Sequence, residues 1–143
     1  MCGCLSVIGG NFTTRLAGEP KEAVLFAGND TFAGTEKIVA IAKGEYRDKE
    51  ALTIRGTSYV VDSLEAALWC FYHTDTFAKA ILLAANLGDD ADTTAAICGQ
   101  VACAFYGESG MPTAWLMRLI QRHEISQLAL ELYQKGIEQV EHE

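Results

Sequence analysis

Three carboxylates fall within four residues at Asp89, Asp90 and Asp92, and two threonines, Thr93 and Thr94, follow directly. Two carboxylates about 6 Å apart repel by roughly 3 kcal/mol at an effective dielectric constant near 20, so a cation would compensate them. Carboxylate and hydroxyl oxygens favour a hard ion such as Mg²⁺, Mn²⁺ or Ca²⁺ over zinc. A divalent ion held by these residues could activate a water molecule as a nucleophile.

The same residues also have a purely structural interpretation, because acids stabilise the N-terminus of a helix. Each acid there contributes about 0.3 to 1 kcal/mol, and a capping hydrogen bond adds about 1 kcal/mol. These energies rival the repulsion between two carboxylates. The need for only one aspartate in a cap favours metal binding, but spacing alone leaves both interpretations open.

Two known acidic motifs fit this segment poorly. A calcium loop that starts at Asp90 would need glycine at 95 and glutamate at 101, where the sequence has Ala95 and Val101. Residues 90–94 also resemble the DxDxT nucleophile loop of haloacid-dehalogenase-like phosphatases, which in that family follows a buried strand. The segment before it here has helical spacing, so we disfavour the phosphatase interpretation.

The elements that position this cluster are predicted to be helices, because apolar residues recur mostly three and four apart and there are only two prolines. Segment 92–106 is apolar or small on nearly every face, which predicts a central helix buried all round. We expect an all-α fold, a compact bundle of six or seven helices, as one domain over residues 1–143. The predicted helices follow Pro20, cover 36–43, 59–73, about 75–86 and 92–106, follow Pro112, and span about 125–133.

Hydroxyl residues before the predicted helices are candidate N-caps. They are Thr35 for 36–43, Thr57 or Ser58 for 59–73, and Thr74 for the helix that ends near Gly88. Spacing predicts a core stripe of Val60, Leu64, Ala67, Leu68 and Phe71 in one helix, and of Phe77, Ala80, Ile81 and Ala84 in the next.

The charge and hydropathy of the sequence limit the kinds of partner that we expect the chain to bind. The formal net charge is −8 with no cluster of Lys and Arg, so we expect no direct nucleic-acid partner. No apolar run reaches the ~18 residues that a membrane helix needs, and we expect no membrane partner. Five cysteines without a paired framework indicate a reducing, cytoplasmic location.

Three longer stretches together resemble one family. They are GTSYVVDSLEAALWCF (56–71), TDTFAKAILLAANLGDDADTTAAICGQVACAFYG (74–107) and MPTAWLMRLI (111–120). In order and spacing they resemble the ADP-ribosylglycohydrolases, including the dinitrogenase-reductase-activating glycohydrolases of bacteria. The resemblance covers roughly the last two-thirds of the chain, and its most specific part is the Asn-Leu-Gly-x-Asp-x-Asp-Thr core.

The resemblance implies an all-α fold with a pair of Mg²⁺ or Mn²⁺ ions at the bottom of an ADP-ribose cleft. It implies hydrolysis of the glycosidic bond between ADP-ribose and an acceptor in an ADP-ribosylated protein or a small molecule. Asp90 and Asp92 would be the catalytic metal ligands, and Thr93 would complete the ligand set. The substrate loop would comprise Gly56, Thr57, Ser58 and Tyr59, and the Tyr59 ring could stack on a base.

The chain also departs from the family pattern. Asp89 and Ser58 stand where many members have glycine, and the Thr-Asp-Asp-Thr ligand motif of the family's first half is missing; Thr74-Asp75-Thr76 has one Asp and reads as a cap. Three protein oxygens are too few for two hard ions. We therefore expect a C-terminal half that forms a homo-oligomer or pairs with a complementing N-terminal chain. Two alternatives stay open: an inactive ADP-ribose-binding module, and a structural remnant like some animal lens proteins.

Overall fold

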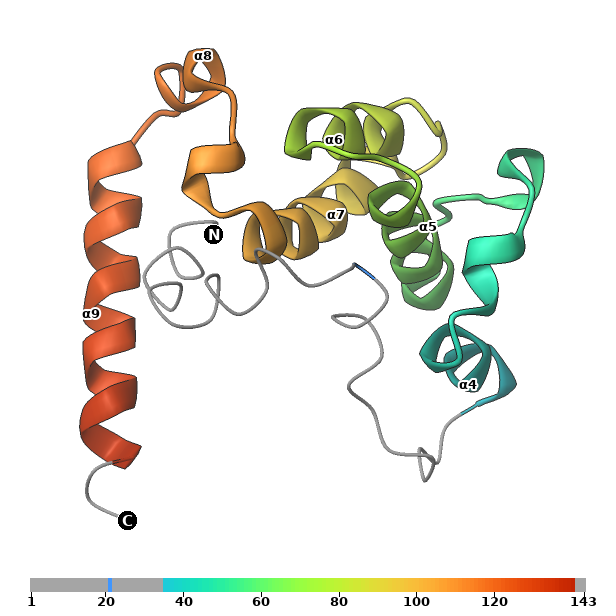
Figure 1. Ribbon diagram of the computed structural model, residues 1–143, viewed down its shortest axis with the longest axis horizontal. Helices are drawn as coiled ribbons and strands as arrows, with labels where there is room; N and C mark the ends of the chain where they lie inside the picture. The colour runs from blue at the N-terminus through green and yellow to red at the C-terminus, as the bar shows by residue number, and fades with distance from the viewer. Residues whose placement is uncertain (1–20, 22–34, 141–143) are drawn as a thin grey trace.

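The computed structural model describes Lys21 and residues 35–140, and every regular element in that part of the chain is helical (Figure 1). The predicted all-α fold is therefore confirmed. The α-helices are α4 (Glu36–Ala42), α5 (Val60–Tyr72), α6 (Phe77–Ala85), α7 (Ala91–Tyr106), α8 (Thr113–Leu116) and α9 (Arg122–Val140). Short 3₁₀ helices are η2 (Glu45–Asp48), η3 (Ala51–Thr53) and η4 (Glu108–Gly110). The helix expected after Pro20 lies, apart from Lys21, outside the described residues.

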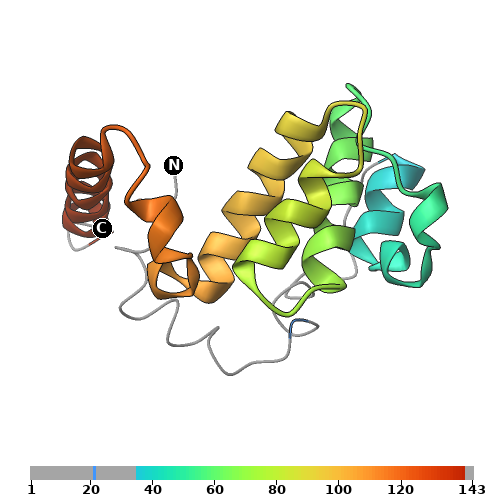
Figure 2. The same cartoon turned by 90° about the horizontal axis from the view of Figure 1, so that it is seen from above.

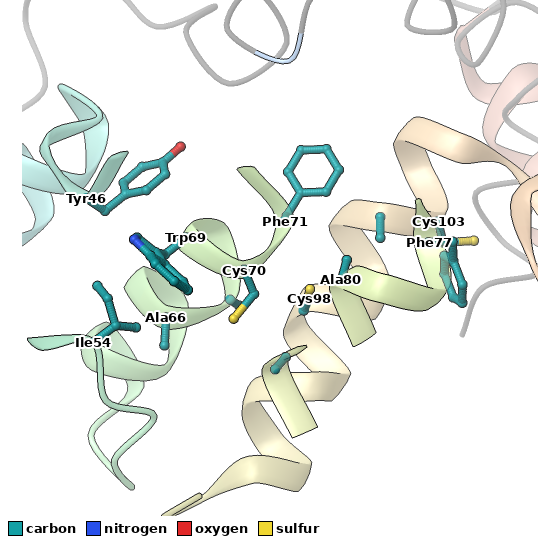
Figure 3. Packing of buried hydrophobic residues seen from close by; sticks show 13 residues of the cluster. Tyr46, Ile54, Ala66, Trp69, Cys70, Phe71, Phe77, Ala80, Cys98 and Cys103 are labelled. Carbon is teal, nitrogen blue, oxygen red and sulfur yellow. The ribbon is translucent and has the colours of Figure 1, made fainter. Parts of the chain in front are cut away.

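The core lies where α7 packs along both α5 and α6 (Figure 2). Small buried side chains let the three helices approach closely, and aromatic rings fill the remaining space (Figure 3). Trp69 anchors the segment before α5, because its indole N–H donates to the carbonyl of Lys49 at 3.0 Å. The residues that these helices contribute to the hydrophobic core cluster are Ala66, Ala67, Trp69, Cys70, Phe71, Phe77, Ala80, Ala84, Cys98, Ala102 and Cys103.

Helix α7 departs from the prediction that it is buried all round. Its buried residues form one stripe, namely Thr94, Cys98, Ala102 and Cys103. Ala96 and Gln100, on another face, are exposed. The reason is that α5 and α6 cover one side of α7, so small residues on its other faces do not imply burial.

The start of α5 also differs from the prediction. Tyr59 is the N-cap residue and makes no capping hydrogen bond through its side chain, so neither Thr57 nor Ser58 occupies the predicted position. Val60 is 68% exposed while Val61 is buried, which corrects the first member of the expected stripe. Ala67 and Phe71 are fully buried as predicted.

The start of α6 lies two residues later than predicted. The cap is Thr76, whose hydroxyl accepts the backbone N–H of Lys79 at 3.2 Å. The Thr74 hydroxyl instead donates to the carbonyl of Cys70 at 2.7 Å and belongs to the end of α5. The predicted stripe of α6 is confirmed, since Phe77, Ala80 and Ala84 are buried and Ile81 is half-buried.

Helix α9 stands apart from this core in both views (Figures 1 and 2), whereas Trp115 of α8 lies edge-on to the Phe77 ring of α6, with the ring centroids 6.2 Å apart. Pro112 precedes α8 as predicted, but α8 has only four residues. On α9, Ala129 is buried, whereas Leu128 and Leu132 of the expected apolar stripe are more than half exposed. Within residues 35–140, no helix combines the length and the hydropathy that a membrane span requires.

Candidate functional site

Two loops that lie far apart in the sequence meet at the N-terminus of α7. One is the substrate-loop candidate, residues 56–59, which leads into α5. The other is the acidic loop, residues 86–90, which joins α6 to α7. The backbone N–H of Asp90 donates to the carbonyl of Gly56 at 2.8 Å. The structure thus brings the two predicted site segments side by side.

The carboxyl groups of Asp90 and Asp92 lie together at the start of α7. Asp90 is the N-cap residue, but its side chain makes no capping hydrogen bond, so helix capping does not explain it. The pKa of Asp92 is held below its ordinary value first by a hydrogen bond with the Asp90 carboxyl. The backbone N–H groups of Thr93 and of Asp92 itself lower that pKa further, as expected at a helix N-terminus.

Asp89, the third carboxylate, is directed to a different partner. The Arg55 guanidinium forks onto it, with Nε 2.9 Å from Oδ2 and Nη2 3.0 Å from Oδ1. The backbone of Asp89 has a φ of 53° and follows Gly88 at 80°, so two consecutive residues are left-handed. This conformation explains why glycine suits position 89, and why aspartate, which tolerates it better than most residues, can replace glycine there.

Gly56 and Thr94 form the closest approach between the two loops. A Cβ atom placed on Gly56 would lie 2.1 Å from Oγ1 of Thr94, which leaves no room for any side chain at position 56. Thr94 is fully buried, and both its backbone N–H (3.1 Å) and its hydroxyl (3.0 Å) donate to the Asp90 carbonyl. Sequence reasoning missed the role of Thr94, because its contact with Gly56 joins two segments that lie far apart in the sequence.

The rest of the substrate-loop candidate is fixed at its second residue and open at the next two. The Thr57 hydroxyl donates to Oδ2 of Asp62 at 2.9 Å and accepts the backbone N–H of Tyr59 at 3.1 Å. Ser58 is exposed, and the Tyr59 ring is half-exposed with the Lys37 ammonium 5.3 Å from its centroid. The pKa of Asp62 is lowered, first by its hydrogen bond with Lys37 at 2.7 Å and also by Thr57.

The donor set for a metal ion is incomplete in the part of the chain that the structure describes. No group of three or more His, Cys, Asp or Glu side chains there is gathered closely enough to hold an ion. Two adjacent carboxyls remain, Asp90 and Asp92, with Thr93 exposed beside them. Their oxygen chemistry fits one face of a Mg²⁺ or Mn²⁺ site, with the other ligands supplied by water or from elsewhere.

A comparison with known protein families shows to which family the chain belongs. Residues 7–141 match the family model described as ADP-ribosylglycohydrolase. The chain belongs to the ADP-ribosylglycohydrolase family. Both loops of the candidate site lie inside the matched range, which confirms the family resemblance seen in the sequence.

Individual relatives of this ADP-ribosylglycohydrolase chain are similar over limited parts of their length. It is 52% identical over 97 residues to ADP-ribosylarginine hydrolase Tri1 of Serratia proteamaculans, which covers 68% of this chain and 26% of that protein. It is 42% identical over 133 residues to the Tri1 hydrolase of Pseudomonas putida, covering 93% and 35%. It is 37% identical over 82 residues to ADP-ribosyl-[dinitrogen reductase] glycohydrolase of Rhodospirillum rubrum, covering 56% and 28%.

The fold of this chain is also similar to that of a solved structure. It is described as an ADP-ribosylglycohydrolase-related protein complex and has a TM-score of 0.69 and 37% identity. The match covers 85% of this chain and 42% of that chain. The chain thus spans about a quarter to a third of the curated relatives, and less than half of the solved one.

Proposed function

We propose that this chain forms part of the active site of an ADP-ribosyl hydrolase that cleaves the bond between ADP-ribose and an arginine side chain. The observation that carries the proposal is the pair of adjacent carboxyls, Asp90 and Asp92, in a loop hydrogen-bonded to Gly56. The arginine acceptor is supported by the names of two relatives, both ADP-ribosylarginine hydrolases. The reaction adds water across the glycosidic bond, so ADP-ribose leaves with a new hydroxyl and the guanidine regains a hydrogen.

Asp90, Asp92 and Thr93 would hold Mg²⁺ or Mn²⁺, which when bound would lower the pKa of a water molecule and so supply the nucleophile. Asp90 contributes a carboxyl that helix capping leaves free, and Asp92 contributes a second carboxyl beside it. The Gly56 to Tyr59 loop would bind ADP-ribose, with Thr57 fixed by Asp62 and the Tyr59 ring available for stacking. The remaining ligands would come from outside the described residues, through a complementing chain or a second copy.

Metal binding is tested by titrating Mn²⁺ into the chain and following the heat. We expect Asp92→Asn to weaken Mn²⁺ binding at least tenfold, because it removes one of two charged ligands. The matched control is Asp75→Asn, which neutralises an exposed acid paired with Lys79 at the start of α6. Equal Mn²⁺ affinity in the wild-type chain and both variants would contradict the metal site.

Hydrolysis is tested with an ADP-ribosylated arginine peptide, scored by mass spectrometry for released ADP-ribose. The assay compares the chain alone with the chain plus a fragment from a relative that carries the Thr-Asp-Asp-Thr segment. We expect release with the complementing fragment and loss of release with Asp92→Asn. Absence of release in every mixture that binds Mn²⁺ and ADP-ribose would contradict the hydrolase proposal.

A second candidate function is ADP-ribose binding without turnover. It is favoured by the absence of a third acidic ligand near Asp90 and Asp92 among residues 35–140. Saturable ADP-ribose binding that is independent of Mn²⁺, in a chain that never releases ADP-ribose from the peptide, would support it. Sedimentation of the same samples would show whether the chain associates with itself or with the complementing fragment.

A further inference from the structure

Thr94 is a buried polar residue that the proposed chemistry does not use. Its side chain is fully buried in the first turns of α7, while its neighbours Asp92 and Thr93 are exposed. A threonine hydroxyl bonded to the carbonyl four residues earlier usually stabilises a helix little. Its position against the backbone of Gly56 therefore needs another explanation.

The contacts around Asp90 supply that explanation. The Asp90 N–H is held by the Gly56 carbonyl, and the Asp90 carbonyl is held by both donors of Thr94. Both peptide groups that flank its α-carbon are thus fixed, at a φ of −85° and a ψ of 59° that lie outside the helical and extended regions. The side chain makes no capping hydrogen bond and lies beside the carboxyl of Asp92.

The same threonine limits how the two loops can move. The β-branched side chain of Thr94 has few rotamers. It lies so close to Gly56 that a Cβ atom at position 56 would overlap it. A shift of the substrate-loop candidate toward α7 would therefore press on Thr94, whose hydroxyl holds the Asp90 carbonyl. A shift of the loop away from α7 would pull on the hydrogen bond from the Asp90 N–H to the Gly56 carbonyl.

We propose that Thr94 is a positioning residue that, together with Gly56, makes the two loops one unit and thereby couples cation binding at Asp90 and Asp92 to ADP-ribose binding at residues 56–59. The inference rests on the proposed function for the identity of the two ligands. Coupling is reciprocal, so Mn²⁺ strengthens ADP-ribose binding by the same factor by which ADP-ribose strengthens Mn²⁺ binding.

The test compares Thr94→Val, which keeps the shape and removes the hydroxyl, with Thr94→Ser, which keeps the hydroxyl. The control is Cys103→Ala, a buried truncation in the same helix away from the loops. Backbone amide exchange is measured for residues 55–59 and 88–92. We expect Thr94→Val to raise exchange about fivefold in both segments together, the factor associated with one net hydrogen bond. Thr94→Ser, which keeps the hydroxyl, should exchange the Asp90 amide as slowly as the wild-type chain does.

The second measurement is the affinity for Mn²⁺ alone, for ADP-ribose alone, and for each in the presence of the other. We expect Thr94→Val to weaken Mn²⁺ binding several-fold and to abolish the mutual strengthening, whereas Cys103→Ala lowers the melting temperature and leaves the mutual strengthening intact. A purely structural role predicts that Thr94→Val behaves like Cys103→Ala in both measurements, and that result would overturn the inference.

The two proposals fail in different ways. If the wild-type chain binds neither Mn²⁺ nor ADP-ribose, the proposed function and the ligand part of the inference both fail. The exchange experiment still decides whether Thr94 joins the loops. If the wild-type chain binds both ligands independently of each other, the proposed function stands and the coupling is wrong.

Discussion

Asp89 shows how a single residue combines backbone conformation and charge. A left-handed φ costs an ordinary residue roughly 1–2 kcal/mol, and aspartate tolerates it better than a β-branched residue. The carboxylate also pairs with Arg55, across an exposed surface where an ion pair contributes little stability. The Arg55 guanidinium therefore offsets locally the negative charge that Asp89 adds next to Asp90 and Asp92.

This explanation predicts different outcomes for two substitutions at position 89. Asp89→Gly and Asp89→Val both remove the ion pair, but the left-handed conformation is strained for valine and not for glycine. We expect Asp89→Val to be less stable than Asp89→Gly by about 1–2 kcal/mol in urea unfolding. Equal free energies of unfolding for the two variants would show that the loop relaxes away from this conformation.

Asp62 makes the stability of the chain depend on pH. Its folded pKa lies below the ordinary value of 3.8, chiefly because of the hydrogen bond with Lys37. The unfolded carboxyl therefore takes up a proton first as pH falls. The stabilisation is fully present well above pH 3.8 and is lost as pH falls through the folded pKa.

We expect Asp62→Asn to unfold with a shallower loss of stability between about pH 5 and pH 2 than the wild-type chain. Lys37→Met should flatten the same part of the profile, since it removes the largest cause of the shift. Thermal melts across this pH range provide the measurement. Parallel acid limbs for all three proteins would mean that the Lys37 and Asp62 pair does not persist in solution.

The site was only partly predictable at the residue scale. The sequence patterns pointed to Gly56 and Asp90, and the structure brings the two together. Arg55 and Thr94 were missed, because their roles depend on contacts between segments more than 30 residues apart. Such contacts leave no periodic signal in a single sequence.

At the scale of elements, helix existence was predictable and helix starts were less so. Thr74 and Thr76 are both plausible caps by residue type, and only the backbone turn between α5 and α6 selects Thr76. Val60 and Val61 differ by one position, which on a helix is a rotation of about 100°. Burial of α7 was overestimated because small residues allow close packing without requiring it.

The cap of α6 provides a direct test of this assignment. We expect Thr76→Ala to destabilise the chain by about 1 kcal/mol, because the Lys79 N–H loses its partner. Thr35→Ala is the matched control, since Thr35 is the N-cap residue of α4 and makes no capping hydrogen bond through its side chain. Guanidinium unfolding of both variants measures the difference. Equal losses would contradict the assigned caps.

At the scale of the whole molecule, Lys21 ties an early part of the chain to the core. Its ammonium donates to the carbonyls of Phe71 and Thr74, and lies 4.3 Å from the centroid of the Phe71 ring. The Phe105 and Tyr106 rings lie within 6 Å of it. Carbonyls at the end of α5 and three aromatic faces together form a favourable environment for a cation.

We expect Lys21→Ala to lower the free energy of unfolding by about 1–3 kcal/mol, because it removes charge-assisted hydrogen bonds and the cation–π contacts. Lys43→Ala, which removes an exposed lysine after α4, should change it by less than about 0.5 kcal/mol. Urea titration followed by circular dichroism distinguishes them. An unchanged midpoint for Lys21→Ala would show that the contact contributes nothing to folding.

The close approach of Gly56 to Thr94 has a consequence for how such a sequence can evolve. Position 56 cannot be enlarged alone, because a side chain there needs a smaller residue than threonine at position 94. A library randomised at both positions and selected for folding should therefore return complementary pairs, small with large, rather than independent preferences. A double variant that exchanges sizes at positions 56 and 94 should therefore be more stable than the single variant that enlarges position 56 alone.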